Sequence, residues 1–250
     1  MRVPAEPSSS IEPAMTDEGV TMSLIEHLEE LRRRIVIIIV TVVVAAVAGF
    51  YFSGGVLKLL RAPLPDEFDK IYFTGVTDAF AAQLKIAGFL GIAIAMPMIL
   101  FQIWRFVTPG LTSGERRFVW PVIVAALLLF VLGVGIGYAI IPYALTFLLS
   151  FGGDTLTPLL TIDKYIGFVT TMMLAFGLVL EFPIVLIGLA RVGILNHRRL
   201  AAQRRWAILV IVVLAVVLTP GGDPISPLIL SGVMFILFEG SLLVIRFIRR

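Results

Sequence analysis

The sequence contains no cysteine and only two histidines, His27 and His197, which lie far apart in the chain. Without cysteine there can be no disulfide, no thiol nucleophile and no thiolate metal site. The sequence also lacks a GxxxxGK[ST] phosphate-binding loop, so no motif indicates nucleotide hydrolysis. We therefore expect no metal, no cofactor, no nucleic-acid partner and no enzymatic activity.

Charged residues are also scarce. They make up 15% of the 250 residues, whereas a soluble domain carries about 25%. Hydrophobic residues make up 59%, and the mean hydropathy is +1.02. This composition predicts a polytopic membrane protein.

Six apolar segments, separated by polar or Pro- and Gly-containing connections, predict an all-α fold with six transmembrane helices. The expected spans are residues 35–52, 76–104, 118–143, 166–190, 206–219 and 225–245. The fifth span has 14 residues, about 21 Å of helix, which is short of a hydrocarbon core of about 30 Å. Residues 1–22 are rich in Pro, Ser and acids, and are expected to form a disordered tail before one membrane domain, residues 23–250.

The basic residues are distributed unevenly between the two sets of connections. Fifteen Lys and Arg residues lie in the segments on the side of the N-terminus, and four lie on the other side. Lys85 falls within the second span. Because cytoplasmic loops of membrane proteins are enriched in Lys and Arg, this ratio predicts that both termini are cytoplasmic.

The segment Ser23–Ile35, SLIEHLEELRRRI, is an amphipathic helix that leads into the first span. Ser23 with Glu26 three residues later fits a capping box at the helix start. Glu29 and Glu30 can pair with Arg33 and Arg34 one turn later on the same helix. This segment therefore places carboxylates at the inner surface of the membrane.

Glu181 is an acid inside the fourth span. It lies ten residues before Arg191, about 15 Å of helix, and so near the middle of the bilayer. An isolated charge there costs about 2.5 to 3.5 kcal/mol on insertion scales. Either the carboxyl is protonated, or it faces a polar partner or a water-filled concavity, or it forms a hydrogen bond with a packed helix. Glu239, in the sixth span, either pairs with a basic residue near the inner surface or has a functional role.

Several motifs, in order along the chain, resemble those of the TatC family, the large membrane subunit of the twin-arginine protein translocase. They are HLEELRRR before the first span, APL at 62–64, FQIWRFVTPGL and GERR between spans two and three, AFG and EFP in span four, and LTPGGD after span five. The resemblance runs from about Leu24 to Phe247. It implies a bacterial inner-membrane receptor that binds twin-arginine signal peptides and uses the proton-motive force to export folded proteins.

The resemblance also implies roles for individual residues. The signal-peptide site would comprise Glu30, Arg32, Phe106, Pro109 and Glu115. TatA- and TatB-like single-span partners would dock at Glu181, Val216 and Leu218, and Pro63 and Asp223 would be functional residues of the outer face. The resemblance is also consistent with self-association. Two separated carboxylates suit an arginine pair, because guanidinium and carboxylate form bidentate, charge-assisted hydrogen bonds.

Two other functions remain open from the residues alone. Pro97 and Pro183 interrupt two spans, as in the broken helices of secondary transporters for small solutes. These two spans run in the same direction, however, so they cannot be counterparts in an inverted repeat. Asp154 and Asp223, each in a GGD triplet, could form the aspartate pair of an intramembrane protease. Both lie in outer connections, where such a site would be neither buried nor shielded from water.

Overall fold

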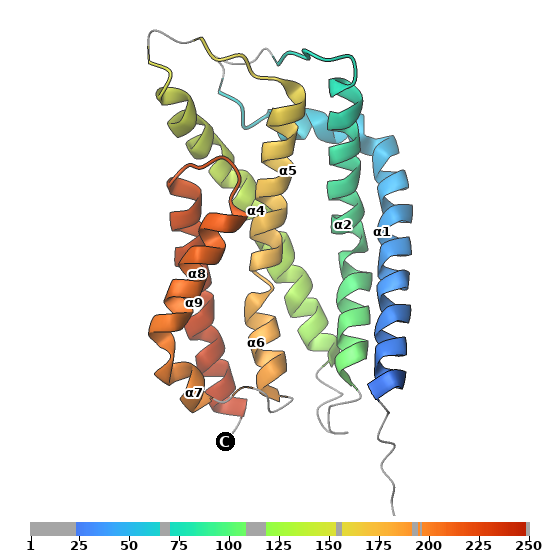
Figure 1. Cartoon of the computed structure of the whole chain (residues 1–250), viewed down its shortest axis with the longest axis vertical. Coiled ribbons are helices and arrows are strands. Elements are labelled where there is room, and N and C mark those ends of the chain that lie inside the picture. The colour runs from blue at the N-terminus through green and yellow to red at the C-terminus, as the bar shows by residue number, and fades with distance from the viewer. Residues whose placement is uncertain are drawn as a thin grey trace, which may run out of the picture.

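The structure is a computed structural model that describes residues 24–65, 71–108, 119–153, 157–191, 195 and 197–248. The helices, shown in Figure 1, are α1 (Leu24–Arg61), α2 (Asp78–Val107), α4 (Val119–Ser150), α5 (Ile162–Val179), α6 (Phe182–Arg191), α7 (His197–Ala202), α8 (Arg204–Leu218) and α9 (Ile225–Ile248). In these ranges the extended structure is an isolated bridge between Tyr72 and Thr161. The predicted all-α fold is confirmed.

Within the described ranges, five helical stretches are long and apolar enough to cross a membrane. They are Ile25–Arg61, Asp78–Val107, Val119–Ser150, Ile162–Arg191 and Ile225–Phe247. The remaining predicted span corresponds to α8, whose 15 residues extend for about 22 Å. The six predicted spans are therefore all helical, and the fifth is the short one, as expected.

Two helices extend further than predicted. The first helix continues past residue 52 to Arg61, through Gly54 and Gly55, because Leu60 in its last turn is fully buried in the core. The third predicted span continues past residue 143 to Ser150, with Pro142 inside the helix. The connection predicted at residues 53–75 is correspondingly shorter.

The fourth predicted span is broken in the middle. Helix α5 ends at Val179 and α6 begins at Phe182, with Leu180 and Glu181 in a turn between them. Pro183 has no N–H to donate to the carbonyl of Val179, so the helical hydrogen-bond pattern is interrupted at this point. Instead, the carbonyl of Glu181 accepts hydrogen bonds from the N–H groups of Ile184 and Val185.

In Figure 1, α1 and α2 lie side by side at one edge of the bundle, and α8 and α9 form a hairpin at the other. Helix α5 lies between them with α6 beneath it, and α4 runs diagonally against α5. The start of α1 and the end of α9 lie at the same end of the bundle, which we call the inner end. An even number of crossings requires this arrangement. The turn between α8 and α9 lies well below the outer ends of α2 and α5.

The end of α1 is held in place at the outer end by two tyrosines from other helices. The hydroxyl of Tyr165 on α5 donates to the carbonyl of Leu60 at 2.7 Å, and that of Tyr138 on α4 donates to the carbonyl of Leu59 at 2.9 Å. The last carbonyls of a helix have no partner within the helix. The tyrosines therefore cap α1 and connect it to α4 and α5.

Replacing Tyr165 with phenylalanine is expected to lower the free energy of unfolding by about 1 kcal/mol, because a buried carbonyl loses its donor. For a chain of this size that corresponds to a fall in Tm of roughly 2 to 4 °C. Thermal unfolding of the purified protein in detergent measures the change. Tyr143→Phe is the control, because Tyr143 is an exposed tyrosine on α4. An equal fall in both variants would contradict the capping role.

Candidate functional site

Glu30 on α1 is the predicted acid of the inner-end site, and it is paired with an arginine of its own helix. The Nε atom of Arg34 donates to Oε1 of Glu30 at 3.1 Å, and Nη2 donates to the same oxygen. The third nitrogen, Nη1, donates to Oε1 of Gln102 on α2 at 3.1 Å. Arg34 is largely buried, with 12% of its side chain exposed. Of the pairings predicted one turn apart, that of Glu30 with Arg34 is confirmed, and Arg34 also connects α1 to α2 through Gln102.

The second carboxylate oxygen of Glu30 has a different environment. Oε2 is buried and has no hydrogen-bond partner among the described residues, and Nδ1 of His27 lies 3.9 Å from it. The His27 ring stacks on the ring of Phe106, with centroids 4.3 Å apart and 16° between the planes. The structure thus brings Phe106, another predicted site residue, to the same end of α1 and α2.

A cavity of about 190 Å³ opens beside these groups. It is lined by Glu30, Arg33, Arg34, Ile37, Gln102 and Arg105. With one acid and three arginines, this part of the site is positively charged. Two other predicted members, Pro109 and Glu115, lie outside the described residues, and Arg32 is exposed on α1.

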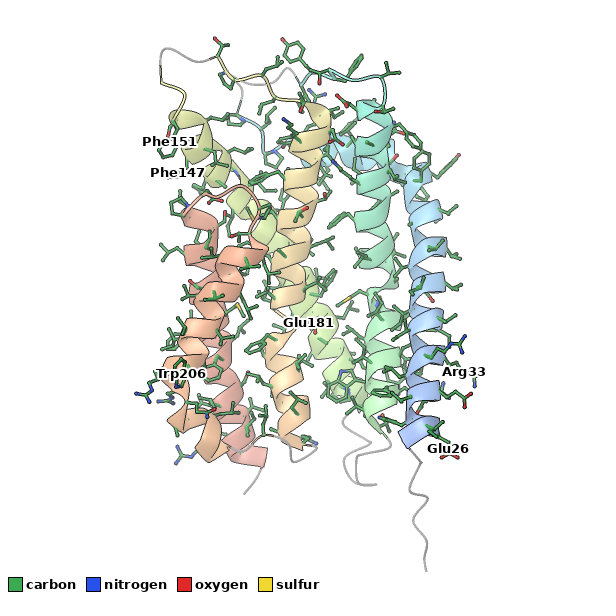
Figure 2. All side chains as sticks on the ribbon, in the orientation of Figure 1. Glu26, Arg33, Phe147, Phe151, Glu181 and Trp206 are labelled. Atoms are coloured by element: carbon green, nitrogen blue, oxygen red, sulfur yellow. The ribbon has the colours of Figure 1, made fainter. Side chains whose placement is uncertain are left out.

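Glu181 lies in the turn between α5 and α6, about midway along the bundle in Figure 2. Only 9% of the residue is exposed, and its neighbour Leu180 is fully buried. Oε1 of Glu181 is buried without a hydrogen-bond partner among the described residues. For this oxygen, the predicted alternative of a hydrogen bond to a packed helix is not observed.

Glu239 on α9 is different, because its Oε2 accepts a hydrogen bond at 2.9 Å from Nη2 of Arg204 at the start of α8. The predicted pairing of Glu239 with a basic residue near the inner end is therefore confirmed.

A family model and known proteins of similar sequence indicate the same family. Residues 26–232 match the family model described as Sec-independent protein translocase protein (TatC). A protein of that name from Carboxydothermus hydrogenoformans is 41% identical over 229 residues, covering 91% of this chain and 94% of the relative. A second, from Deinococcus radiodurans, is 35% identical and covers 99% of this chain and 94% of the relative. The chain belongs to the TatC family.

A solved TatC structure supports the assignment. The crystal structure of a twin-arginine translocase receptor TatC has 33% sequence identity and a TM-score of 0.77, and it covers 90% of this chain and 100% of that chain. Membership in the TatC family favours a protein translocase over the solute transporter that the proline-interrupted spans left open. For the protease alternative, Asp154 lies outside the described residues.

The other residues that the TatC resemblance singled out lie on α8 and in the turn after it. Val216 and Leu218 are exposed on α8, which is buried only at Ile211 and Ala215. Val216 also lines a cavity of about 430 Å³ together with Asp223. Asp223 is buried, and its Oδ1 accepts the backbone N–H of Ser226 at 2.7 Å, so it caps the start of α9.

Pro63, the outer-face proline of the TatC resemblance, is buried in the turn that follows α1. In this turn the N–H of Ala62 donates to the carbonyl of Leu59, and that of Leu64 donates to the carbonyl of Arg61. The fixed φ of proline favours such a turn and prevents α1 from continuing. Pro63 therefore sits directly beside the helix end that the two tyrosines cap.

Gln102 on α2 was not among the residues predicted for the site. It is 4% exposed and holds the guanidinium of Arg34 from α2. Its position in the sequence could have identified it, because it is a lone amide within the otherwise apolar run from Ile86 to Trp104. Among the described residues, no cluster of three or more His, Cys, Asp or Glu side chains could hold a metal ion.

Proposed function

We propose that this chain is the receptor subunit of a twin-arginine protein translocase. It binds signal peptides with two consecutive arginines at the inner end of α1 and α2. Together with TatA- and TatB-like single-span subunits, it exports folded proteins with energy from the proton-motive force. Membership in the TatC family supports the role in translocation, and the geometry around Glu30 supports the position of the peptide site.

The observation that carries this proposal is the state of the Glu30 carboxylate. One oxygen already binds the guanidinium of Arg34, which supports a site suited to arginine. The other oxygen is buried and has no hydrogen-bond donor among the described residues, and it lies beside His27, whose ring stacks on that of Phe106. A peptide arginine can supply that donor, while Glu115 from the following loop would bind the second arginine. A lysine would fit less well, because its ammonium cannot form a bidentate pair.

Partner subunits would dock on the lipid-facing side of the bundle. Oε1 of Glu181 is buried near the middle of the membrane and has no donor in the part of the chain that the structure describes, so a polar side chain on a single transmembrane helix would supply one. Val216 and Leu218 on α8 would provide the apolar part of the contact, since both are exposed. Crosslinking from these positions to co-expressed partners tests the assignment.

We place the protein in the bacterial cytoplasmic membrane with both termini inside. The excess of Lys and Arg on the side of the termini supports this orientation. The arrangement of α1 and α9, whose ends lie together at the inner end, is compatible with it. Labelling that found the two termini on opposite sides of the membrane would contradict this placement.

The peptide site is tested with Glu30→Gln and Glu115→Gln. Each variant keeps an acceptor oxygen but removes the charge, so affinity for a twin-arginine peptide should fall by about five- to tenfold. Fluorescence anisotropy with a labelled peptide and the purified chain in nanodiscs measures the dissociation constant. Glu29→Gln is the matched control, because Glu29 is an exposed acid next to Glu30 on α1. Unchanged affinity in both test variants would refute the site.

A further inference from the structure

The site around Glu30 already contains a bound arginine, namely Arg34 of the chain itself. Its Nε and Nη2 both donate to Oε1 of Glu30. A carboxylate and a guanidinium form their strongest pair when two parallel hydrogen bonds use both carboxylate oxygens. An incoming arginine cannot form that pair with Glu30 while Arg34 occupies Oε1, because the pair needs both oxygens and, among the described residues, Oε2 alone is without a donor.

Gln102 gives Arg34 a second partner that does not depend on Glu30. Its Oε1 accepts from Nη1 of Arg34, and its amide is buried between α1 and α2, with Nε2 placed 3.9 Å from the sulfur of Met98. If the ion pair between Arg34 and Glu30 breaks, the guanidinium of Arg34 keeps its hydrogen bond to Gln102. The energetic penalty of releasing Glu30 is therefore smaller than for an arginine held by the carboxylate alone.

We propose that Arg34 competes with the signal-peptide arginine for the carboxylate of Glu30. Gln102 holds Arg34 when Glu30 pairs with the peptide arginine instead. The proposal rests on the proposed function of the Glu30 site and concerns how tightly that site binds. Peptide binding exchanges one guanidinium for another at Glu30. The net gain in binding free energy is the difference between two similar ion pairs of Glu30, so the peptide binds weakly enough to be released after transport.

This exchange makes opposite predictions for two residues that contact each other. In Arg34→Gln the competitor is gone, so a twin-arginine peptide should bind about three- to tenfold more tightly. In Gln102→Leu the released Arg34 has no alternative partner, so the peptide should bind about threefold more weakly. In the double variant, Gln102→Leu should have no further effect on the affinity of Arg34→Gln, because Gln102 acts only through Arg34.

The measurement is the dissociation constant of a labelled twin-arginine peptide for the full chain in nanodiscs at neutral pH. Arg246→Gln is the control, since it removes the same charge at the inner end of another helix, α9. Arg246 is exposed and does not line the cavity beside Glu30. If Arg246→Gln tightens binding as much as Arg34→Gln, the effect is general electrostatics and the proposal is wrong.

Weaker or unchanged binding in Arg34→Gln would overturn the proposal, because it would mean that Arg34 only orients Glu30 or supports the helix pair. Should Arg34→Gln fail to give monodisperse, helical protein, Arg34→Lys takes its place. It keeps the charge but cannot occupy Oε1 with two fixed donors, and it should tighten binding by about twofold. Failure of the proposed function is distinguishable, since the wild-type chain would then show no preference for a twin-arginine over a twin-lysine peptide.

Discussion

Replacing Gly133 with leucine is expected to prevent α4 from packing against α5 and to leave little folded protein. A Cβ atom at Gly133 would lie 2.5 Å from the carbonyl oxygen of Phe176 and 2.8 Å from the Cα of Gly177. Both are backbone atoms of α5, so no side chain can move aside to make room. Separating the two helices would cost about 3 kcal/mol or more.

The control for this prediction lies two residues further along the same helix. Gly135 is exposed, and a Cβ atom there would meet nothing within 4 Å. Gly135→Leu should therefore be as stable as the wild-type chain or slightly more so, because leucine has the higher helix propensity. The yield of monodisperse protein after extraction, together with thermal unfolding in detergent, compares the two variants. A Gly133→Leu protein with a wild-type Tm would show that α4 and α5 do not cross at this point.

Replacing Glu181 with leucine should reduce transport of a twin-arginine cargo by roughly three- to twentyfold while leaving peptide affinity within about twofold. Interhelical hydrogen bonds in membranes contribute about 0.6 to 1.7 kcal/mol, which corresponds to roughly three- to twentyfold in partner affinity. In the proposed partner contact, the buried Oε1 of Glu181 would be the acceptor of such a bond. The proposed peptide site is at the inner end of α1 and α2, on other helices, and should not respond.

Export of a reporter cargo and crosslinking to the single-span partners measure the effect of Glu181→Leu. Glu181→Gln keeps a hydrogen-bonding group and should retain most of the transport. Glu239→Gln is a second control, because that acid already pairs with Arg204 inside the chain. Full transport by Glu181→Leu would remove Glu181 from the partner site.

The helical fold could be predicted from the sequence because each span is a long apolar run, and burial in lipid requires such runs to be helical. The ends of the helices were less predictable. The first helix continues to Arg61 because Leu60 is buried against other helices and its carbonyl is capped by Tyr165. These contacts come from residues about a hundred positions away, which periodicity within one segment cannot reveal.

The candidate site could likewise be predicted only in part from the sequence. The sequence shows the charges of Glu30 and Arg34 one turn apart and the lone acid at Glu181. Each of these charged groups needs a partner, and so each marks a candidate position. The contact between Arg34 and Gln102 joins residues 68 positions apart, so it became visible only once α1 and α2 were packed together. The second predicted acid, Glu115, lies outside the described residues and remains a prediction from the resemblance.

The short helix α8 has a consequence for the surrounding lipid. Exposed Trp206 lies near the inner end of α8 in Figure 2, and the indole side chain prefers the headgroup level of a membrane. Counted from there to Leu218, α8 extends for about 20 Å, which is about 10 Å less than a hydrocarbon core of about 30 Å. Acyl chains beside α8 are therefore expected to shorten or tilt, which would lower the barrier to a hydrated chain along this flank of the protein.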